Sequence, residues 1–282
     1  MSDNENWSLI IRPKRKLLEI PIREIIRYRD LVFLFTKRDF VTQYKQTILG
    51  PIWYIVNVII STIMYTFVFG NLAKIGTDGI PHILFYYSGT MLWTFFTGCF
   101  MDASSVFLAN ANIFGKVYFP RLVVPISKVF INSLKFFIQF VMFILIFFYF
   151  LITGTLFVFS WQMLLFPLIV LWLAAIGTGM GIIISSLTTK YRDLNQLVSF
   201  ALGLAMYATP VVYPLSEIPE RFSWLAFANP VSAPIELFRY CYFGVSSVEI
   251  SMILSSLGIT ALLIFFGLIL FNQNEQNFID VI

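Results

Sequence analysis

Three basic residues, Arg27, Arg38 and Lys45, recur eleven and seven residues apart near the start of the chain. Both spacings return to nearly the same side of an α-helix. Clustered cations bind anionic oxygen groups, and a helix with a basic and an apolar face lies in a membrane interface. The pattern predicts an amphipathic interface helix over residues 22–48. Its apolar arc would be formed by Ile26, Phe33, Leu34, Phe40, Val41 and Tyr44.

Motifs for nucleotide binding are missing from the sequence, and the one histidine that could bind a metal has no neighbouring ligands. No G-x-x-x-x-G-K-[ST] phosphate loop occurs, and Gly115-Lys116 lacks both the preceding glycine and a strand before it. The single histidine, His82, has no cluster of metal ligands around it in the sequence. We therefore expect no catalytic residues, no metal and no cofactor in this chain, and the energy for any transport would come from another protein.

Apolar residues dominate the composition: 59% of the 282 residues are hydrophobic, 18% are aromatic and only 12% are charged. Soluble domains carry about 25% charged residues, and a folded core of this size cannot bury so much apolar surface. The composition excludes an ordinary cytosolic enzyme, a disordered chain and a disulfide-stapled module. It indicates an all-α integral membrane protein.

Long stretches without charged residues predict six transmembrane helices. About 20 apolar residues cross a bilayer, because each helical residue rises 1.5 Å through a layer about 30 Å thick. Gly177, Gly179 and Gly181 fall within the fourth span, where small residues allow helices to pack closely. The spans lie near residues 51–72, 82–103, 126–151, 162–187, 195–214 and 250–271.

The positions of the basic residues orient these spans. With six spans, every lysine and arginine except Lys74, Arg221 and Arg239 falls on one side of the membrane. The positive-inside rule makes that side cytoplasmic. Both termini are then expected in the cytoplasm, including a polar tail over residues 1–21. Residues 22–282 would form a single membrane domain, because neither a repeat nor a low-complexity linker divides them.

Two further segments interrupt the hydrophobic pattern. Residues 106–116 are too polar to cross a membrane, and they predict a short cytoplasmic helix. The external segment 215–248 contains two apolar helices, near 220–228 and 233–243, that are each about half a membrane long. Helices of this length dip into the membrane and return while packed on protein. We therefore expect two short re-entrant helices between spans five and six.

Four groups of residues follow one another along the chain. They are Arg38-Asp39 with Tyr44-Lys45-Gln46-Thr47-Ile48-Leu49-Gly50-Pro51-Ile52-Trp53; Gly115-Lys116-Val117-Tyr118-Phe119-Pro120-Arg121; Tyr191-Arg192-Asp193-Leu194 with Thr209-Pro210-Val211-Val212-Tyr213-Pro214; and Asn229-Pro230 with Glu236-Leu237-Phe238-Arg239. Each group alone is a weak signal. Together they resemble the permease subunits of ABC type-2 polysaccharide exporters, which move O-antigen, capsule and teichoic acid chains. The resemblance rests on their order, spacing and topology, and it covers about residues 25–245.

The resemblance implies a partner set and a cargo. The chain would form a homodimer bound to two copies of a separate ABC ATPase, which would hold ATP and Mg²⁺. The substrate would be an O-antigen-like polysaccharide on an undecaprenyl-pyrophosphate lipid, as used in lipopolysaccharide biosynthesis. The location would be the bacterial inner membrane, with no nucleic-acid partner.

The resemblance also suggests residues for substrate contact. Arg38 and Lys45 would capture the pyrophosphate, while contact with anionic lipid or with the ATPase is the competing interpretation. Aromatic residues would line the glycan path because aromatic faces stack on sugar rings, although Trp and Tyr also gather at membrane interfaces. The aromatic residues are Trp53, Tyr54, Tyr65, Tyr207 and Tyr213.

A second set of residues would gate the path or couple it to the ATPase. The turn Leu49-Gly50-Pro51 would gate the cytoplasmic mouth. Trp224, Glu236 and Arg239 would gate the outer exit, with the last two paired three residues apart on one helix; a structural cap is the competing interpretation. Asn112, Gly115 and Lys116 would lie on the coupling helix that enters a groove of the ATPase.

Two alternatives stay open from the sequence. One is an ABC type-2 exporter of drugs or lipids, which would lack the signature from Tyr44 to Trp53. The other is a membrane glycosyltransferase or polymerase, which would need catalytic carboxylates in a large loop. The segment 215–248 has Glu217, Glu220 and Glu236 but neither Asp nor His, which argues against that class.

Overall fold

The computed structural model describes residues 22–45, 47–114, 119–154, 160–188, 193–245 and 248–281, and all regular elements in these ranges are helical. The predicted tail 1–21 lies outside them. Within this part of the chain, four helical segments are long and apolar enough to cross a membrane. They are Ile52–Leu72, Val123–Ile152, Trp161–Thr188 and Ile250–Gln273.

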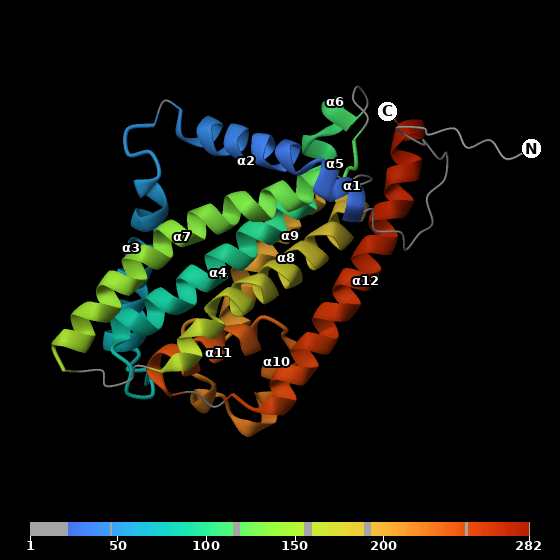
Figure 1. Ribbon diagram of the computed structural model, residues 1–282. Helices are drawn as coiled ribbons and strands as arrows, with labels where there is room; N and C mark the ends of the chain where they lie inside the picture. The colour runs from blue at the N-terminus through green and yellow to red at the C-terminus, as the bar shows by residue number, and fades with distance from the viewer. Residues whose placement is uncertain are drawn as a thin grey trace, which may run out of the picture.

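The centre of the bundle is α4 (His82–Ser104), most of whose residues are buried. It packs on α8 (Phe166–Thr188) and on α7 (Val123–Ile152), and α12 (Ile250–Val281) packs on the other side of α8 (Figure 1). The helix α4 contains more polar residues than the four membrane-length segments. It can do so because neighbouring helices, and not lipid, surround it. Its bounds still match the predicted second span, 82–103.

Glycines set the distance between α4 and α8. A Cβ atom added at Gly177 would lie 2.8 Å from the carbonyl oxygen of Phe96, and one at Gly181 would lie 2.5 Å from that of Phe100. Such approaches are too close for any larger residue. Gly179 faces Leu263 of α12 in the same way, at 3.3 Å. The interpretation of these glycines as small packing residues is confirmed.

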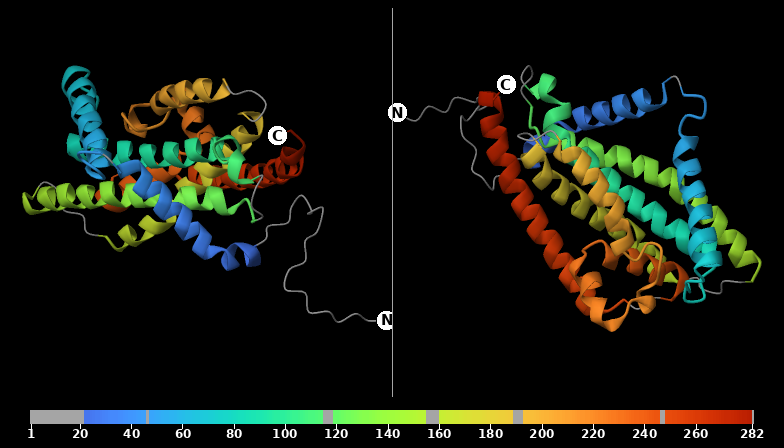
Figure 2. Two further views of the ribbon diagram at one scale, coloured as in Figure 1. Left: turned by 90° about the horizontal axis from the view of Figure 1, so that it is seen from above. Right: turned by 180° about the vertical axis from the view of Figure 1, so that it is seen from behind.

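Two apolar helices are packed much less. The helix α3 (Ile52–Tyr65) continues into the π-helix η1 (Thr66–Leu72), and only Val58 and Thr62 of α3 are buried. The helix α9 (Leu194–Ala205), followed by the short turn η3 (Met206–Ala208), buries none of its twelve residues. Figure 2 shows α3 and α9 on the same side of α4. This side therefore exposes apolar side chains from both helices.

The two ends of the bundle carry different elements. At one end, here the α2 end, lie α1 (Ile22–Arg27), α2 (Arg29–Tyr44), α5 (Val106–Ala109), α6 (Ala111–Phe114) and the last turns of α12 (Figure 1). At the opposite end, the α11 end, lie α10 (Ser223–Ala228) and α11 (Ser232–Phe243). The remaining short elements are η2 (Trp161–Leu165), η4 (Leu215–Glu217) and η5 (Glu220–Phe222).

Several predicted helices prove to be shorter or divided. The interface helix 22–48 is split at Tyr28 and ends at Tyr44, because Lys45 leaves the helical conformation with ψ 120°. The predicted span 195–214 ends as a helix at Ala208, where Thr209 becomes extended ahead of a proline that cannot continue the helical hydrogen bonds. The helical part of that span is therefore shorter than the membrane-length segments.

The short predicted helices also differ in detail. The predicted helix 106–116 is interrupted at Asn110, whose side-chain Nδ2 donates to the carbonyl of Val106 at 2.9 Å and so competes with the backbone. The predicted helix 220–228 appears as η5 followed by α10, and 233–243 appears as α11. The predicted apolar arc does not form a single apolar face on α2, since its members Phe33 and Leu34 are exposed while the apolar residues Val32 and Phe35, which lie outside the arc, pack inward.

The glycine contact between α4 and α8 can be tested with two equivalent substitutions. Gly181→Ala should lower the free energy of unfolding by about 1–3 kcal/mol relative to Gly258→Ala, because its methyl group collides with backbone. A Cβ at Gly258 meets no atom within 4 Å, and both changes alter helix propensity equally. Denaturant titration of the purified variants measures the difference. Equal stability would contradict the packing argument.

Candidate functional site

One face of α7 carries a polar stripe inside an otherwise apolar helix. Its members recur at helical spacing and are Lys128, Asn132, Lys135 and Gln139. Lys128 Nζ donates to Asp39 Oδ2 of α2 at 2.8 Å, and Asn132 Nδ2 donates to Asp102 Oδ2 of α4 at 2.8 Å. Gln139 Nε2 donates to the carbonyl of Tyr54 in α3 at 3.2 Å. The polar stripe thus joins α7 to three other helices.

The predicted substrate cation Arg38 is part of this network. Its Nη2 lies 2.7 Å from Asp39 Oδ1, and its guanidinium carbon lies 4.8 Å from the centroid of the Phe35 ring. Its side chain is still 42% exposed. Lys45 is exposed just beyond the last turn of α2. The structure places both cations at the α2 end, and their role in substrate capture stays a prediction.

Asp39 is the acceptor that links α2 to α7. Burial raises the pKa of this carboxyl group, but hydrogen bonds from Lys128 and Arg38 and their positive charges outweigh the burial. The pKa of Asp39 therefore lies below its ordinary value. A carboxylate held ionised by two cations fixes the orientation of α2 against α7.

The predicted turn between α2 and α3 is observed. Gly50 has a φ of +52°, in the left-handed region that glycine adopts most readily, and the chain enters α3 directly after Pro51. The amide of Ile52 donates to the carbonyl of Leu49 at 3.1 Å, which closes the turn. Its proposed role as a gate is not tested by this geometry.

The five predicted path aromatics fall into two groups. Trp53 and Tyr54 lie at the start of α3, where the Tyr54 hydroxyl donates to Gln43 Oε1 at 2.6 Å. Tyr65 lies about 17 Å further along the helix, and its hydroxyl contacts the sulfur of Met206 at 3.5 Å.

The second group is completed by residues that follow α9. The Tyr213 hydroxyl donates to the carbonyl of Tyr207 at 3.0 Å. The structure therefore brings Tyr65, Tyr207 and Tyr213 together around η3, nearer the α11 end. Tyr213 also lines a cavity of about 490 Å³ bordered by α10.

The predicted pair of Glu236 and Arg239 is confirmed, but both residues are buried. Arg239 is 1% exposed, and its Nη1 donates to Glu236 Oε1 at 2.7 Å. The same guanidinium donates to the carbonyls of Pro210 at 2.5 Å and of Val211 at 3.0 Å. Its carbon lies 3.7 Å from the centroid of the Phe85 ring in α4. Arg239 thus clamps the segment after η3 between α11 and α4.

The sequence predicted the ion pair but not the hydrogen bonds from Arg239 to the carbonyls of Pro210 and Val211. The carbonyl acceptors follow Thr209, where the helical hydrogen bonds stop, and the proline at 210 was the available signal for such free carbonyls. Trp224, the third predicted outer gate residue, is 60% exposed. It belongs to α10, whereas Glu236 and Arg239 belong to α11.

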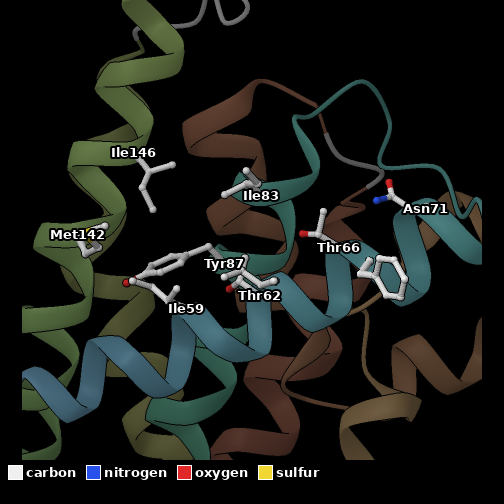
Figure 3. A pocket seen from close by; sticks show the side chains of 10 residues that line it. Ile59, Thr62, Thr66, Asn71, Ile83, Tyr87, Met142 and Ile146 are labelled. Atoms are coloured by element: carbon white, nitrogen blue, oxygen red, sulfur yellow. The ribbon is translucent and has the colours of Figure 1, made fainter.

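A separate apolar cavity of about 410 Å³ lies between α3, η1, α4 and α7. Figure 3 shows its labelled side chains, Ile59, Thr62, Thr66, Asn71, Ile83, Tyr87, Met142 and Ile146, arranged around it. The Tyr87 hydroxyl donates to the carbonyl of Gln139 at 3.0 Å. None of the predicted site residues lines this cavity, so it is distinct from the predicted glycan path.

The predicted coupling residues are only partly described. Asn112 is a residue of α6, which lies at the α2 end of the bundle. Gly115 and Lys116 lie outside the described residues. The geometry therefore leaves their contact with an ATPase as a prediction.

Comparison with known proteins gives a family and several relatives. The profile of the ABC-2 type transporter family matches residues 30–243. Two O-antigen export system permease proteins named RfbA, both from Klebsiella pneumoniae, are 30% identical over 254 residues, covering 90% of this chain and 95% of theirs. An O-antigen export system permease protein RfbA from Myxococcus xanthus is 23% identical over 263 residues, covering 93% of this chain and 98% of its own.

Removing the buried cation of the clamp should be costly. Arg239→Met takes a positive charge from a buried carboxylate and two hydrogen bonds from backbone carbonyls, so unfolding free energy should fall by about 3–5 kcal/mol. The matched control is Arg221→Met, since Arg221 is an exposed arginine that also lies over an aromatic ring, that of Phe222. Thermal unfolding in detergent compares them. Similar melting temperatures for the two variants would show that the clamp carries no stability.

The ionised state of Asp39 gives a prediction for pH. A carboxylate with a lowered pKa stabilises the fold above its ordinary pKa, near 4, and this contribution disappears as pH falls through the lower folded-state value. The melting temperature of the native protein should therefore exceed that of Asp39→Asn at pH 7. The gap should narrow progressively below about pH 4. A gap that is constant over this pH range would contradict the assignment.

Proposed function

The chain belongs to the ABC-2 type transporter family, and from this membership we propose that it is the permease subunit of an ATP-driven exporter of polysaccharide. The observation that carries the proposal is the similarity to two O-antigen export system permeases at 30% identity over 90% of the chain. The cargo we propose is an O-antigen-like polysaccharide carried on undecaprenyl pyrophosphate. Family membership argues against the membrane glycosyltransferase considered from the sequence.

We place the permease in the bacterial inner membrane with six spans and both termini in the cytoplasm. Four membrane-length segments are supplemented by α4 as the second span and by α9 with η3 as the fifth. The α2 end would then face the cytoplasm, and α10 and α11 would form the re-entrant pair on the outer side. The basic residues of α2 support this orientation.

The proposed assembly is a homodimer. The support comes from α3 and α9, which expose apolar side chains on the same side of α4. Phe200 and Leu204 of α9 are 68% and 56% exposed, as are Ile63 and Met64 of α3 at 61% and 53%. A second copy meeting this side would enclose a path lined by Trp53, Tyr54, Tyr65, Tyr207 and Tyr213.

Two copies of a separate ATPase would supply the energy. We propose that ATP and Mg²⁺ bind to these subunits, since the sequence has no phosphate loop. Residues 106–116, including Asn112, Gly115 and Lys116, would contact the ATPase beside α2. ATP-driven closure of the ATPase pair would then move the α2 end.

The mechanism follows from which parts are packed and which are not. We infer that α4, α8 and α12 move as one unit, because their glycines let the helices pack closely. Because α3 is joined to α2 by the Gly50 turn and is sparsely buried, it can move relative to that unit and open the cytoplasmic mouth. At the outer end the Arg239 clamp would keep the segment after η3 in place while α10, with Trp224, moves.

Deletion of the gene tests the function directly. Cells should lose the surface polysaccharide and accumulate the lipid-linked glycan on the cytoplasmic side, because synthesis continues without export. Extraction of lipid-linked glycan and surface labelling measure both quantities, and expression of the chain from a plasmid should restore the surface polymer. Loss of the glycan itself, without accumulation, would instead support a role in synthesis and contradict export.

A further inference from the structure

Lys135 is a charged residue deep in a membrane-length helix. It is twelve residues after the start of α7, which places it about 18 Å along the helix axis. Ionisable residues at such depth face a protein interior or a water-filled cavity, and they mark substrate or ion sites. Lys135 faces Tyr54 of α3, whose ring centroid lies 5.5 Å from its Nζ.

The partners of Lys135 differ from those of the other members of the polar stripe. Lys128, Asn132 and Gln139 each donate a hydrogen bond to another helix, at 2.8, 2.8 and 3.2 Å. Among the described residues, Lys135 forms no ion pair with a carboxylate; its ammonium group packs on the aromatic face of Tyr54, and the charge of Asp102 acts on it at longer range. Its ammonium group therefore keeps donors that no acceptor in this part of the chain uses.

The charges around the polar stripe leave a positive excess. Asp39 is shared between Arg38 and Lys128, and Asp102 accepts from Asn132. These two carboxylates thus face three cations once Lys135 is included. The excess charge lies at the side of the bundle where α2 turns into α3.

A second polar group without a partner lies next to Tyr54. The Tyr44 ring packs edge-on against the Tyr54 ring with centroids 5.4 Å apart. The Tyr44 hydroxyl is buried and has no hydrogen-bond partner within the described part of the chain. A buried hydroxyl without a partner costs free energy that a bound ligand can recover.

We propose that Lys135 is the cation that binds the diphosphate group of the lipid-linked substrate as it enters from the cytoplasmic side. The site deepens the proposed export function and rests on it. Lys135 supplies the charge, Tyr44 an additional donor, and the Tyr54 ring holds the ammonium group between α7 and α3. Arg38 is already paired with Asp39, so it is a less available ligand than the sequence suggested.

A lipid carrier fits this position better than a free anion. Ile52 and Trp53, which precede Tyr54 on α3, are 54% and 45% exposed and give a hydrocarbon chain an apolar surface. Lys135 also lies within the predicted third span, 126–151, and not in the segment before it. A diphosphate attached to a prenyl chain can bring its charge to Lys135 while the chain lies on the apolar surface of α3.

Binding to the purified full chain tests the proposal with four probes: undecaprenyl diphosphate, neutral undecaprenol, phosphatidylglycerol and inorganic pyrophosphate. Lys135→Met should weaken binding of undecaprenyl diphosphate about tenfold or more, because a charged hydrogen bond is lost. Binding of undecaprenol should not change, and Lys135→Arg should restore most of the affinity for the diphosphate lipid. Lys74→Met, at an exposed lysine near the α11 end, is the matched control and should bind all four probes as the native chain does.

Three outcomes would overturn the proposal. They are unchanged binding of undecaprenyl diphosphate by Lys135→Met, an equal loss for undecaprenol, and an equal Lys135-dependent affinity for phosphatidylglycerol or inorganic pyrophosphate. The last outcome would mean a general phosphate site instead of one for the lipid carrier.

A measurement on the native chain covers the case in which Lys135→Met does not fold. Undecaprenyl diphosphate should protect Lys135 from acetylation by a small reagent, followed by mass spectrometry, whereas undecaprenol should not. Lys74 in the same molecules should react equally in both conditions. An extent of Lys135 acetylation that is the same with and without undecaprenyl diphosphate would contradict the proposal.

The two proposals fail in distinguishable ways. If deletion of the gene blocks export but Lys135 has no part in diphosphate binding, the function stands and this site is wrong. If Lys135 binds the diphosphate lipid but deletion leaves export intact, the site stands and the function is wrong.

Discussion

Placing a charged side chain among apolar helices costs free energy, and this cost determines which contacts the buried charges of this chain make. An isolated charged side chain at the centre of a bilayer costs about 3 kcal/mol on insertion scales, so each buried charge needs a compensating contact. At the α11 end Arg239 is compensated by Glu236, two backbone carbonyls and an aromatic ring. At the α2 end Asp39 is compensated by two cations, whereas Lys135 forms no ion pair and packs on an aromatic ring, with the charge of Asp102 acting on it at longer range. The satisfied groups hold the ends of the bundle, and the less satisfied one is where we propose that the substrate binds.

Close packing and exposure divide the same chain into a closely packed and a sparsely packed part. Glycines let α4, α8 and α12 approach until backbone meets backbone, and this contact leaves little room for sliding. The helices α3 and α9 have few buried residues, so their positions depend on whatever covers them in the membrane. In the proposed mechanism the closely packed helices serve as the frame beside which the polymer passes.

Local signals in the sequence predicted the helices well and their ends less well. The second span was placed at 82–103 and is observed as His82–Ser104, because charge-free length is a direct signal. The end of α9 at Ala208 follows from Pro210, but how far a proline shortens a span depends on the tertiary contacts of the next residues. The pairing of Glu236 with Arg239 could be predicted from a spacing of three. The hydrogen bond from Arg239 to the carbonyl of Val211 could not, because it joins segments 28 residues apart. Lys135 falls within the predicted span 126–151, whereas only the structure shows that it faces Tyr54.

The central claim is that this chain is a conduit whose energy comes from a separate ATPase. Reconstitution into liposomes containing a fluorescent lipid-linked glycan tests it most directly, with the purified chain alone and with its ATPase subunit. The account predicts ATP hydrolysis and glycan movement to the opposite leaflet only when both proteins and ATP are present. Hydrolysis of ATP by the chain alone, or glycan movement without the second subunit, would contradict it.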